Sequence, residues 1–207
     1  QLGFTAGGNE ILRIQSDELN INKDIRYGAS TSAVLTSQIY VRGTGTNNNA
    51  DRQCAINGEH QISGGNDTNT GLHLLIFDAT DSLTLDSGTT YNTQSGGSTI
   101  VNNLATAIGA MDRTKIGVLA SYNAFTDDLN DTLRSAAQKV GLFKLAGMDA
   151  GTADAQAYAA IFRGTSDDTN AEVNDAIEVV QSNDGDAPSA IISTFITCKG
   201  NGENAAI

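Results

Sequence analysis

The side chains that could carry out catalysis are few and lie in different parts of the sequence. Ser121 follows an apolar run, as the nucleophile of a strand-to-helix turn does, but the G-x-S-x-G pattern of that turn is missing around it. His73 lies within the apolar residues 72–78, where a strand residue with one hydrogen bond is the simpler interpretation, and His60 lies in a polar segment typical of a surface. We therefore predict structural roles for these three residues, no catalytic residue and no enzymatic activity.

Residues that bind metals or phosphates in other proteins occur here without the required spacing. Cys54 and Cys198 form no C-x-x-C pair, and the two histidines lie in different segments. The glycines at residues 96–97 precede a helical pattern, but no Lys follows them as in a phosphate-binding loop, so helix capping is the better interpretation. The acidic turns at residues 78–81 and 167–168 lack the alternating ligands of a calcium loop. We therefore expect no metal ion and no cofactor.

One polar loop carries the candidate ligand-binding residues. Asn47, Asn48, Asn49 and Asp51 offer amide and carboxylate groups, which can hydrogen-bond to the hydroxyl groups of a glycan. A flexible loop explains the same residues equally well. Aromatic residues, which provide stacking surfaces, make up only 5% of the chain. The sequence leaves both interpretations of this loop open. We expect binding to map to exposed polar loops, namely residues 43–51, 64–70 and 147–156.

The composition excludes several classes of protein. The chain has 207 residues, with 24 acidic and 12 basic side chains and a formal net charge of −12. A field of this sign repels phosphate backbones, so nucleic-acid binding is disfavoured. No apolar run approaches the roughly 20 residues of a membrane-spanning helix. The 22 glycines and the many Asn, Thr, Ser and Asp residues favour turns between short strands over long helices.

Hydrophobic periodicity predicts a mixed α+β domain in the centre of the chain. The residues with strand patterns are 38–42, 53–56, 60–63, 72–78, 82–86, 115–122 and 157–163, with further edge strands at 176–180 and 191–198. Residues 72–78 and 115–122 are continuous apolar runs, which is typical of strands that are buried on both faces. Residues 98–108 and 127–140 have apolar positions at helical spacing, and Ser98 and Thr126 are the expected N-caps.

The N-terminal segment differs from the centre, because its short alternating stretches have no covering element within the segment. We therefore assign residues 1–46 to a β-rich arm that pairs with other copies of the chain, residues 47–199 to a globular domain and residues 200–207 to a tail or linker. Residues 9–22, Asn-Glu-Ile-Leu-Arg-Ile-Gln-Ser-Asp-Glu-Leu-Asn-Ile-Asn, resemble a strand–turn–strand unit of bacteriophage tail-fibre and tail-spike shafts. The turn glycine of that unit is replaced here by Glu18.

A second resemblance rests on the order of segments between residues 52 and 164. The matching segments are residues 52–58, 71–78, 91–93, 116–123, 133–134, 140–141 and 158–164. They resemble the interleukin-like EMT inducer family, and the most specific of them is Val-Leu-Ala-Ser-Tyr at residues 118–122. The family's Asp after this block is missing, since Asn123 and Ala124 follow.

This resemblance implies a fold and a kind of function. The implied fold is α+β, with two small twisted β-sheets packed as a sandwich with two helices, and the implied function is binding of glycans or proteins without chemistry. The family also ties an early Cys to a late one, which here implies a disulfide between Cys54 and Cys198. Phage proteins assemble in a reducing cytoplasm, where thiols usually persist, so two free thiols are the alternative.

The two resemblances together predict a non-enzymatic virion structural protein, a bacteriophage tail fibre or appendage that displays a globular domain for attachment to a host-surface glycan. We expect it in the virion, as a homotrimer that contacts other virion proteins and a host glycan, without nucleic acid and without membrane insertion. The alternative is a secreted or cell-surface carbohydrate- or protein-binding module of a larger extracellular protein.

Overall fold

The computed structural model divides the chain into two compact units, residues 1–33 and 34–207. It describes residues 2–6, 9–14, 19–21, 35–151, 156–166, 175–182, 187–198 and 207. The first unit contains strands β1 (Leu2–Ala6), β2 (Asn9–Ile14) and β3 (Leu19–Ile21), which form an antiparallel sheet in that order. The two strand stretches expected in residues 9–22 are therefore present and pair antiparallel, with Leu12 opposite Ile21, while residues 15–18 between them lie outside the described residues. Pairing of this unit with other copies stays a prediction.

The second unit contains two antiparallel β-sheets. The first has five strands in the order β11 (Ala176–Gln181), β10 (Ala157–Arg163), β9 (Lys115–Tyr122), β7 (Gly71–Asp78) and β8 (Thr84–Tyr91). The second has four strands in the order β12 (Ser189–Cys198), β4 (Leu35–Thr44), β5 (Gln53–Ile56) and β6 (Glu59–His60). A short 3-10 helix, η1 (Asn66–Thr68), precedes β7.

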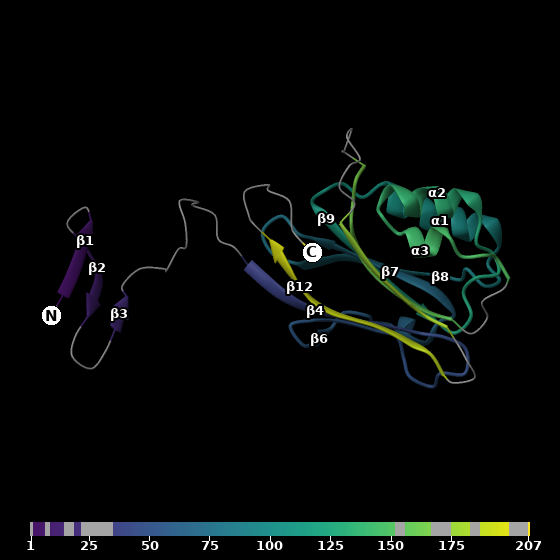
Figure 1. Ribbon diagram of the computed structural model, residues 1–207, viewed down its shortest axis with the longest axis horizontal. Helices are drawn as coiled ribbons and strands as arrows, with labels where there is room; N and C mark the ends of the chain where they lie inside the picture. Colours follow the sequence, from purple (N-terminus) through teal and green to yellow (C-terminus); the bar gives the residue numbers. More distant parts are fainter. Residues whose placement is uncertain are drawn as a thin grey trace. The chain divides into compact units, whose positions relative to one another are not determined.

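Three α-helices cover the face of the five-stranded sheet that is turned away from the four-stranded sheet (Figure 1). They are α1 (Gly97–Gly109), α2 (Asp131–Lys139) and α3 (Phe143–Ala146). The expectation of a mixed α+β fold with two sheets is confirmed. The expected number of two helices is wrong, because α3 was missed: it is only four residues long, too short for helical periodicity to be recognised.

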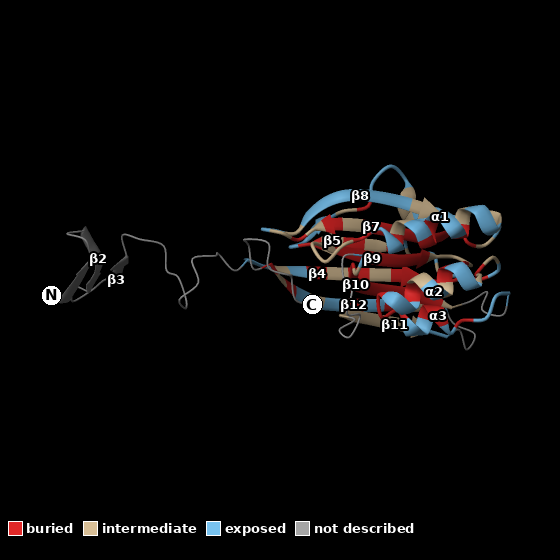
Figure 2. Ribbon diagram, turned by 90° about the horizontal axis from the view of Figure 1, so that it is seen from above, coloured by how far each residue is buried: buried red, intermediate tan, exposed pale blue. Residues whose placement is uncertain are grey.

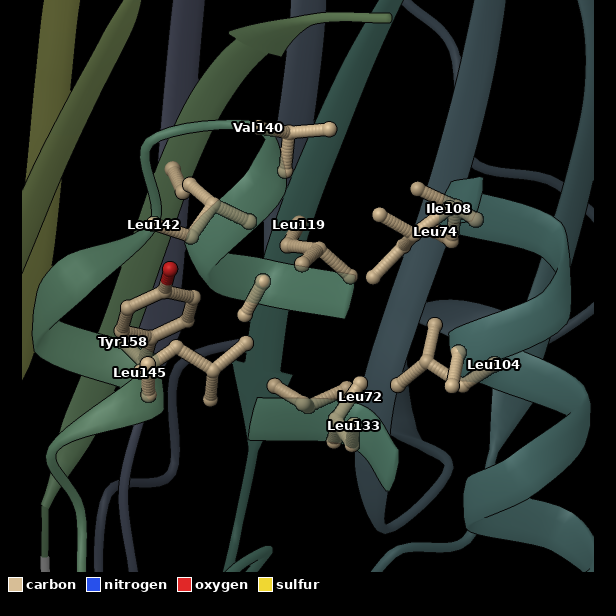
Figure 3. Close-up of a cluster of buried hydrophobic side chains, with 14 of the residues drawn as sticks. Leu72, Leu74, Leu104, Ile108, Leu119, Leu133, Val140, Leu142, Leu145 and Tyr158 are labelled. Atoms are coloured by element: carbon tan, nitrogen blue, oxygen red, sulfur yellow. The ribbon is translucent and has the colours of Figure 1, made fainter. Parts of the chain in front are cut away.

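The three central strands of the five-stranded sheet, β7, β9 and β10, are apolar at nearly every position and are buried on both faces (Figure 2). Alternate residues of these strands enter two separate cores. Leu72, Leu74 and Leu119 pack against the helices, together with Leu104 and Ile108 of α1, Leu133 of α2 and Leu145 of α3 (Figure 3). Leu75, Phe77 and Val118 point the other way and pack against Ile39 and Val41 of β4 and Ile192 and Ile196 of β12.

The boundary of the N-terminal segment differs from the expected one. Residues 35–44, which we assigned to the arm, form β4, a central strand of the four-stranded sheet that pairs with β12 over ten residues and with β5 over four. β4 also approaches the other sheet closely, since a Cβ on Gly43 would lie 1.9 Å from the carbonyl oxygen of Tyr158. At the other end, residues 200–206 of the expected tail lie outside the described residues, and Ile207 packs against the core between the sheets.

Both helix starts were misassigned. The N-cap of α2 is Asn130, whose side chain accepts a hydrogen bond from the Leu133 amide at 3.0 Å, whereas Thr126 is buried four residues earlier. α1 begins at Gly97, so Ser98 lies inside the helix. The Gly97 amide donates instead to the carboxylate of Asp128 at 2.7 Å, which places a negative charge at the positive end of α1.

Candidate functional site

A buried arginine organises the turn before β7. The Arg52 side chain is fully buried, and its guanidinium donates to the carbonyl oxygens of Asn66 at 2.7 Å, Asn69 at 2.7 Å, Gly71 at 3.0 Å and Ala120 at 3.3 Å. Removal from water lowers the pKa of Arg52 to about 10, where the group still carries its charge at neutral pH. Carbonyl dipoles therefore replace water around this cation, and they hold the backbone of residues 66–71 against β9.

Thr90 of β8 joins this arginine to a buried histidine. The Thr90 hydroxyl accepts from Arg52 at 3.0 Å and donates its single proton to Asn66 Oδ1 at 3.1 Å. It lies 2.8 Å from His73 Nδ1, so the imidazole must carry its proton on Nδ1 and donate. Burial, and then the charge of Arg52, lower the pKa of His73 to about 4, so His73 is neutral at pH 7.

A polar hollow of about 660 Å³ opens at the surface beside this network. Its lining consists of uncharged residues, namely Asn66, Asn69, Thr70, Gly88, Thr89, Thr90 and Asn92. Asn66 and Thr90 are engaged in the network described above, and the Asn92 side-chain oxygen accepts from the amides of Gln94 and Ser95. The side chain of the exposed Asn69 uses one of its two amide protons, in a 3.2 Å bond to Asn66 Oδ1. Its side-chain oxygen Oδ1 and its other amide proton therefore retain bonding capacity for a ligand.

The four residues expected to bind a ligand lie in the turn after β4. The side-chain nitrogen of Asn48 donates to the carbonyl oxygens of Ala187 and Pro188 and to the Ser189 hydroxyl, and its oxygen accepts from the Ala50 amide at 2.9 Å. Asn48 thus fixes the start of β12. Asn47, Asn49 and Asp51 are exposed, and Asn47 has a left-handed backbone with φ 65°.

Two of the three polar loops that the sequence analysis expected to bind a ligand meet at Arg52. The Arg52 amide donates to the carbonyl oxygen of Asp67 at 3.2 Å, which joins the turn that contains Asp51 to the turn at residues 64–70. Sequence reasoning singled out both loops but missed the buried arginine and the histidine network between them. The third expected loop, residues 147–156, includes residues 152–155, which lie outside the described residues.

The Ser121 hydroxyl joins the two sheets. It is fully buried, donates to the carbonyl oxygen of Thr44 at 3.0 Å and accepts from the Tyr158 amide at 2.8 Å. Both hydrogen-bonding roles of this oxygen are occupied by backbone groups, which agrees with the structural role expected for Ser121. His60 is exposed on the two-residue strand β6.

Of the two alternatives for Cys54 and Cys198, the structure has the free thiols: the bridge that the resemblance implied is not formed, and both residues are buried. Cys54 lies opposite Val41, which pairs on its other side with Ile192, whereas Cys198 lies opposite Leu35 at the far end of β4. Six residues of β12 separate Ile192 from Cys198, or about 20 Å along a strand. A disulfide needs Cα atoms within about 7 Å, so this fold excludes the bond. Burial raises the pKa of the Cys54 thiol to about 12, which leaves it unreactive.

Among the described residues, no group of three or more His, Cys, Asp or Glu side chains could hold a metal ion, and no helix is long and apolar enough to cross a membrane. In the acidic turn at residues 78–81, Asp78 accepts from Lys115 Nζ at 2.9 Å, and this bond, followed by those from Thr80, lowers the pKa of Asp78 to about 2. The acidic residues 167–168 lie outside the described residues.

A further hollow of about 590 Å³ lies between α1 and α2. Its lining consists mainly of small residues with one positively charged side chain, and includes Ala105, Gly109, Ser135, Ala136 and Lys139.

Compared with known proteins, the chain matches no family model and no curated protein sequence.

Proposed function

We propose that this chain is a non-enzymatic attachment protein, a bacteriophage tail fibre or similar virion appendage whose second unit, a domain like those of the interleukin-like EMT inducer family, binds a glycan on the host surface. The observation that carries the proposal is the uncharged polar hollow beside Arg52, lined by amide and hydroxyl groups. Such groups match the alternating donors and acceptors of a sugar, and a hollow without charged side chains suits a neutral sugar.

The support beneath this hollow favours binding that does not rearrange the protein. The Arg52 hydrogen bonds fix the backbone of residues 66–71, and Thr90 belongs to a strand of the five-stranded sheet. A binding surface held in one conformation loses little conformational entropy when it takes up a ligand. The exposed residues Asn69 and Thr89 are therefore the groups that we propose to contact the sugar.

Several linked copies would make weak binding effective. A single shallow polar site is expected to bind a sugar with a Kd near 1 mM, or about −4 kcal/mol. When copies are tethered, the second contact becomes intramolecular, and the overall affinity rises without new contacts. We propose that the three-stranded N-terminal unit joins the copies, as a homotrimer, so that several hollows face one cell surface.

The proposal is tested by glycan-array and whole-cell binding with two matched variants. Asn69→Ala removes an exposed amide from the hollow, and Asn49→Ala removes an exposed amide from the turn after β4. We expect Asn69→Ala to reduce binding at least tenfold, because one lost hydrogen bond weakens each of several linked sites. We expect Asn49→Ala to bind like the wild type.

Three results would contradict the proposal. Loss of binding in Asn49→Ala alone would move the site to the turn after β4, where the sequence first indicated it. Absence of binding to any glycan or cell would remove the attachment function. Hydrolysis of a polysaccharide by the purified chain would show that the protein is an enzyme.

A further inference from the structure

The two sheets of the second unit have four edge strands, and three of them carry features that prevent pairing with another chain. β8 contains Asp86, which pairs with Lys115, and its register with β7 is interrupted between Ile76 and Phe77. β11 contains Glu178, whose carboxylate accepts from the backbone of α3. β6 has only two residues, one of them Glu59. Charges, bulges and short lengths are the usual devices that protect an edge.

The fourth edge, β12, has none of these features. It is ten residues long, contains no charged residue, and pairs with β4 along its whole length without a register shift. Pro188 is the only proline of the chain and precedes the strand, so every residue of β12 has an amide proton, including those that point away from β4. Within the part of the chain that the structure describes, β12 pairs with β4 alone. An edge of this kind is a template for another strand.

The outward side chains of β12 are unusually apolar for a solvent-facing strand. Phe195 is 62% exposed and Ile191 is 48% exposed, and they lie on the same face with Ser193 between them. The neighbouring positions on β4 are Arg42, Tyr40 and Gln38, so this part of the face carries one positive charge and no acidic residue. In a chain with a net charge of −12, it is a surface on which two copies can meet without repulsion.

We propose that β12 pairs antiparallel with β12 of a second copy of this chain, so that two four-stranded sheets become one sheet across a two-fold axis. Pairing Ser193 with Ser193 of the second copy places each Ile191 opposite a Phe195, on one face. This register is self-complementary, as a two-fold interface requires. Ile191 of each copy contacts Phe195 of the other, so all four exposed hydrophobic side chains are partly covered. The inference goes beyond the proposed attachment function and does not depend on it.

Two paired strands make a smaller interface than the roughly 1,200 Å² of a stable dimer, so the pairing is reversible and favoured at high protein concentration. A cysteine placed at the two-fold axis can detect this pairing, because it would form a disulfide with the same cysteine of the second copy. Paired residues of antiparallel strands have Cα atoms about 4.5–5.5 Å apart, within the range of a disulfide. We expect Ser193→Cys in the full chain to give a reducible dimer under mild oxidation with diamide.

Ser87 of β8 provides the matched control, because it is also an exposed serine on an edge strand. We expect Ser87→Cys and the wild type, whose thiols are buried, to give no dimer above background. Sedimentation should show that Ser193→Lys weakens self-association at least about tenfold, while Ser87→Lys does not. Circular dichroism and melting curves establish that each variant is folded.

Three results would overturn the inference. The first is equal crosslinking of Ser193→Cys and Ser87→Cys. The second is unchanged self-association of Ser193→Lys, which would assign the association of copies to the N-terminal unit. The third is a wild-type chain that stays monomeric at millimolar concentration.

Discussion

The two sheets of the second unit differ in how many of their faces are buried. The five-stranded sheet, the inner sheet, lies between the helices and the four-stranded sheet, and its strands β7, β9 and β10 are buried on both faces. The described residues cover only one face of the four-stranded sheet, the outer sheet, where buried residues of β4 and β12 alternate with partly or fully exposed ones. The inner sheet therefore contributes most to the two cores, whereas the outer sheet has a face and an edge that no described residue covers.

The largest difference between the sheets is expected in the free energy of unfolding when one phenylalanine of each sheet is replaced by alanine. Phe162 is fully buried in β10, and its ring lies so close to Gly117 that a Cβ there would be 2.3 Å from the ring. Phe162→Ala should lower the free energy of unfolding by about 3–5 kcal/mol, since it leaves a cavity. Phe195→Ala, on the exposed face of β12, should change it by less than about 0.5 kcal/mol. Urea denaturation measures both, and equal effects would refute the assigned roles of the sheets.

Two arginines give the next largest difference. Arg52→Met keeps most of the side-chain volume but leaves several buried carbonyl oxygens without a donor, so we expect a loss of about 2–4 kcal/mol. Arg42→Met, on the outer sheet, removes hydrogen bonds to a single carbonyl oxygen, that of Asp51, and should cost about 1 kcal/mol or less. Chemical denaturation decides between these values. A loss below about 1 kcal/mol for Arg52→Met would show that the buried cation is not a major source of stability.

The pH dependence of stability should come in part from His73. Its pKa is lowered from 6.5 to about 4 by folding, so the unfolded chain binds a proton between pH 6.5 and 4 while the folded chain does not. Stability is therefore fully present above pH 6.5, falls as the pH is lowered, and reaches its lowest value near pH 4, with a loss of up to about 3 kcal/mol. His73→Asn keeps a donor for Thr90 but cannot titrate, so it should flatten this part of the profile.

Denaturation between pH 7 and 4.5 measures this dependence, and His60→Asn is the control because His60 is exposed. The Asp78–Lys115 bond is a separate contribution. The pKa of Asp78 is lowered to about 2, so the stability that it provides is lost below the window of His73. A slope in His73→Asn that matches the wild type between pH 6.5 and 4.5 would contradict the assignment.

The inner sheet was more predictable than the outer sheet, for physical reasons. A strand buried on both faces is a continuous apolar run, so residues 72–78 and 115–122 identified β7 and β9 with little need of their neighbours. β4 alternates, like the strands of the N-terminal segment, and its assignment to the second unit follows from its pairing with β5 and with β12, the latter about 150 residues later in the chain. The boundary at residue 46 was wrong for this reason.

The candidate site was predicted less well than the fold. The sequence indicated two of its loops, because Asn, Gly and Asp mark turns. Nothing in the sequence separates Arg52 from a surface arginine, since its burial depends on carbonyl oxygens that residues 66, 69, 71 and 120 bring together. The cap of α1 is similar, because Asp128 lies 31 residues after Gly97. Sites built from backbone carbonyls and distant caps have no local pattern.

The pairing of Leu35 with Cys198 has a consequence for how this unit can be used. These residues are the outer ends of β4 and β12, so the first residue of β4 and the last residue of β12 lie side by side, about 5 Å apart. A unit with adjacent ends can be spliced into a surface loop of an unrelated protein without stretching the host's backbone, as in natural domain insertions. The neighbouring ends of β4 and β12 therefore give this unit the geometry that a domain insertion requires.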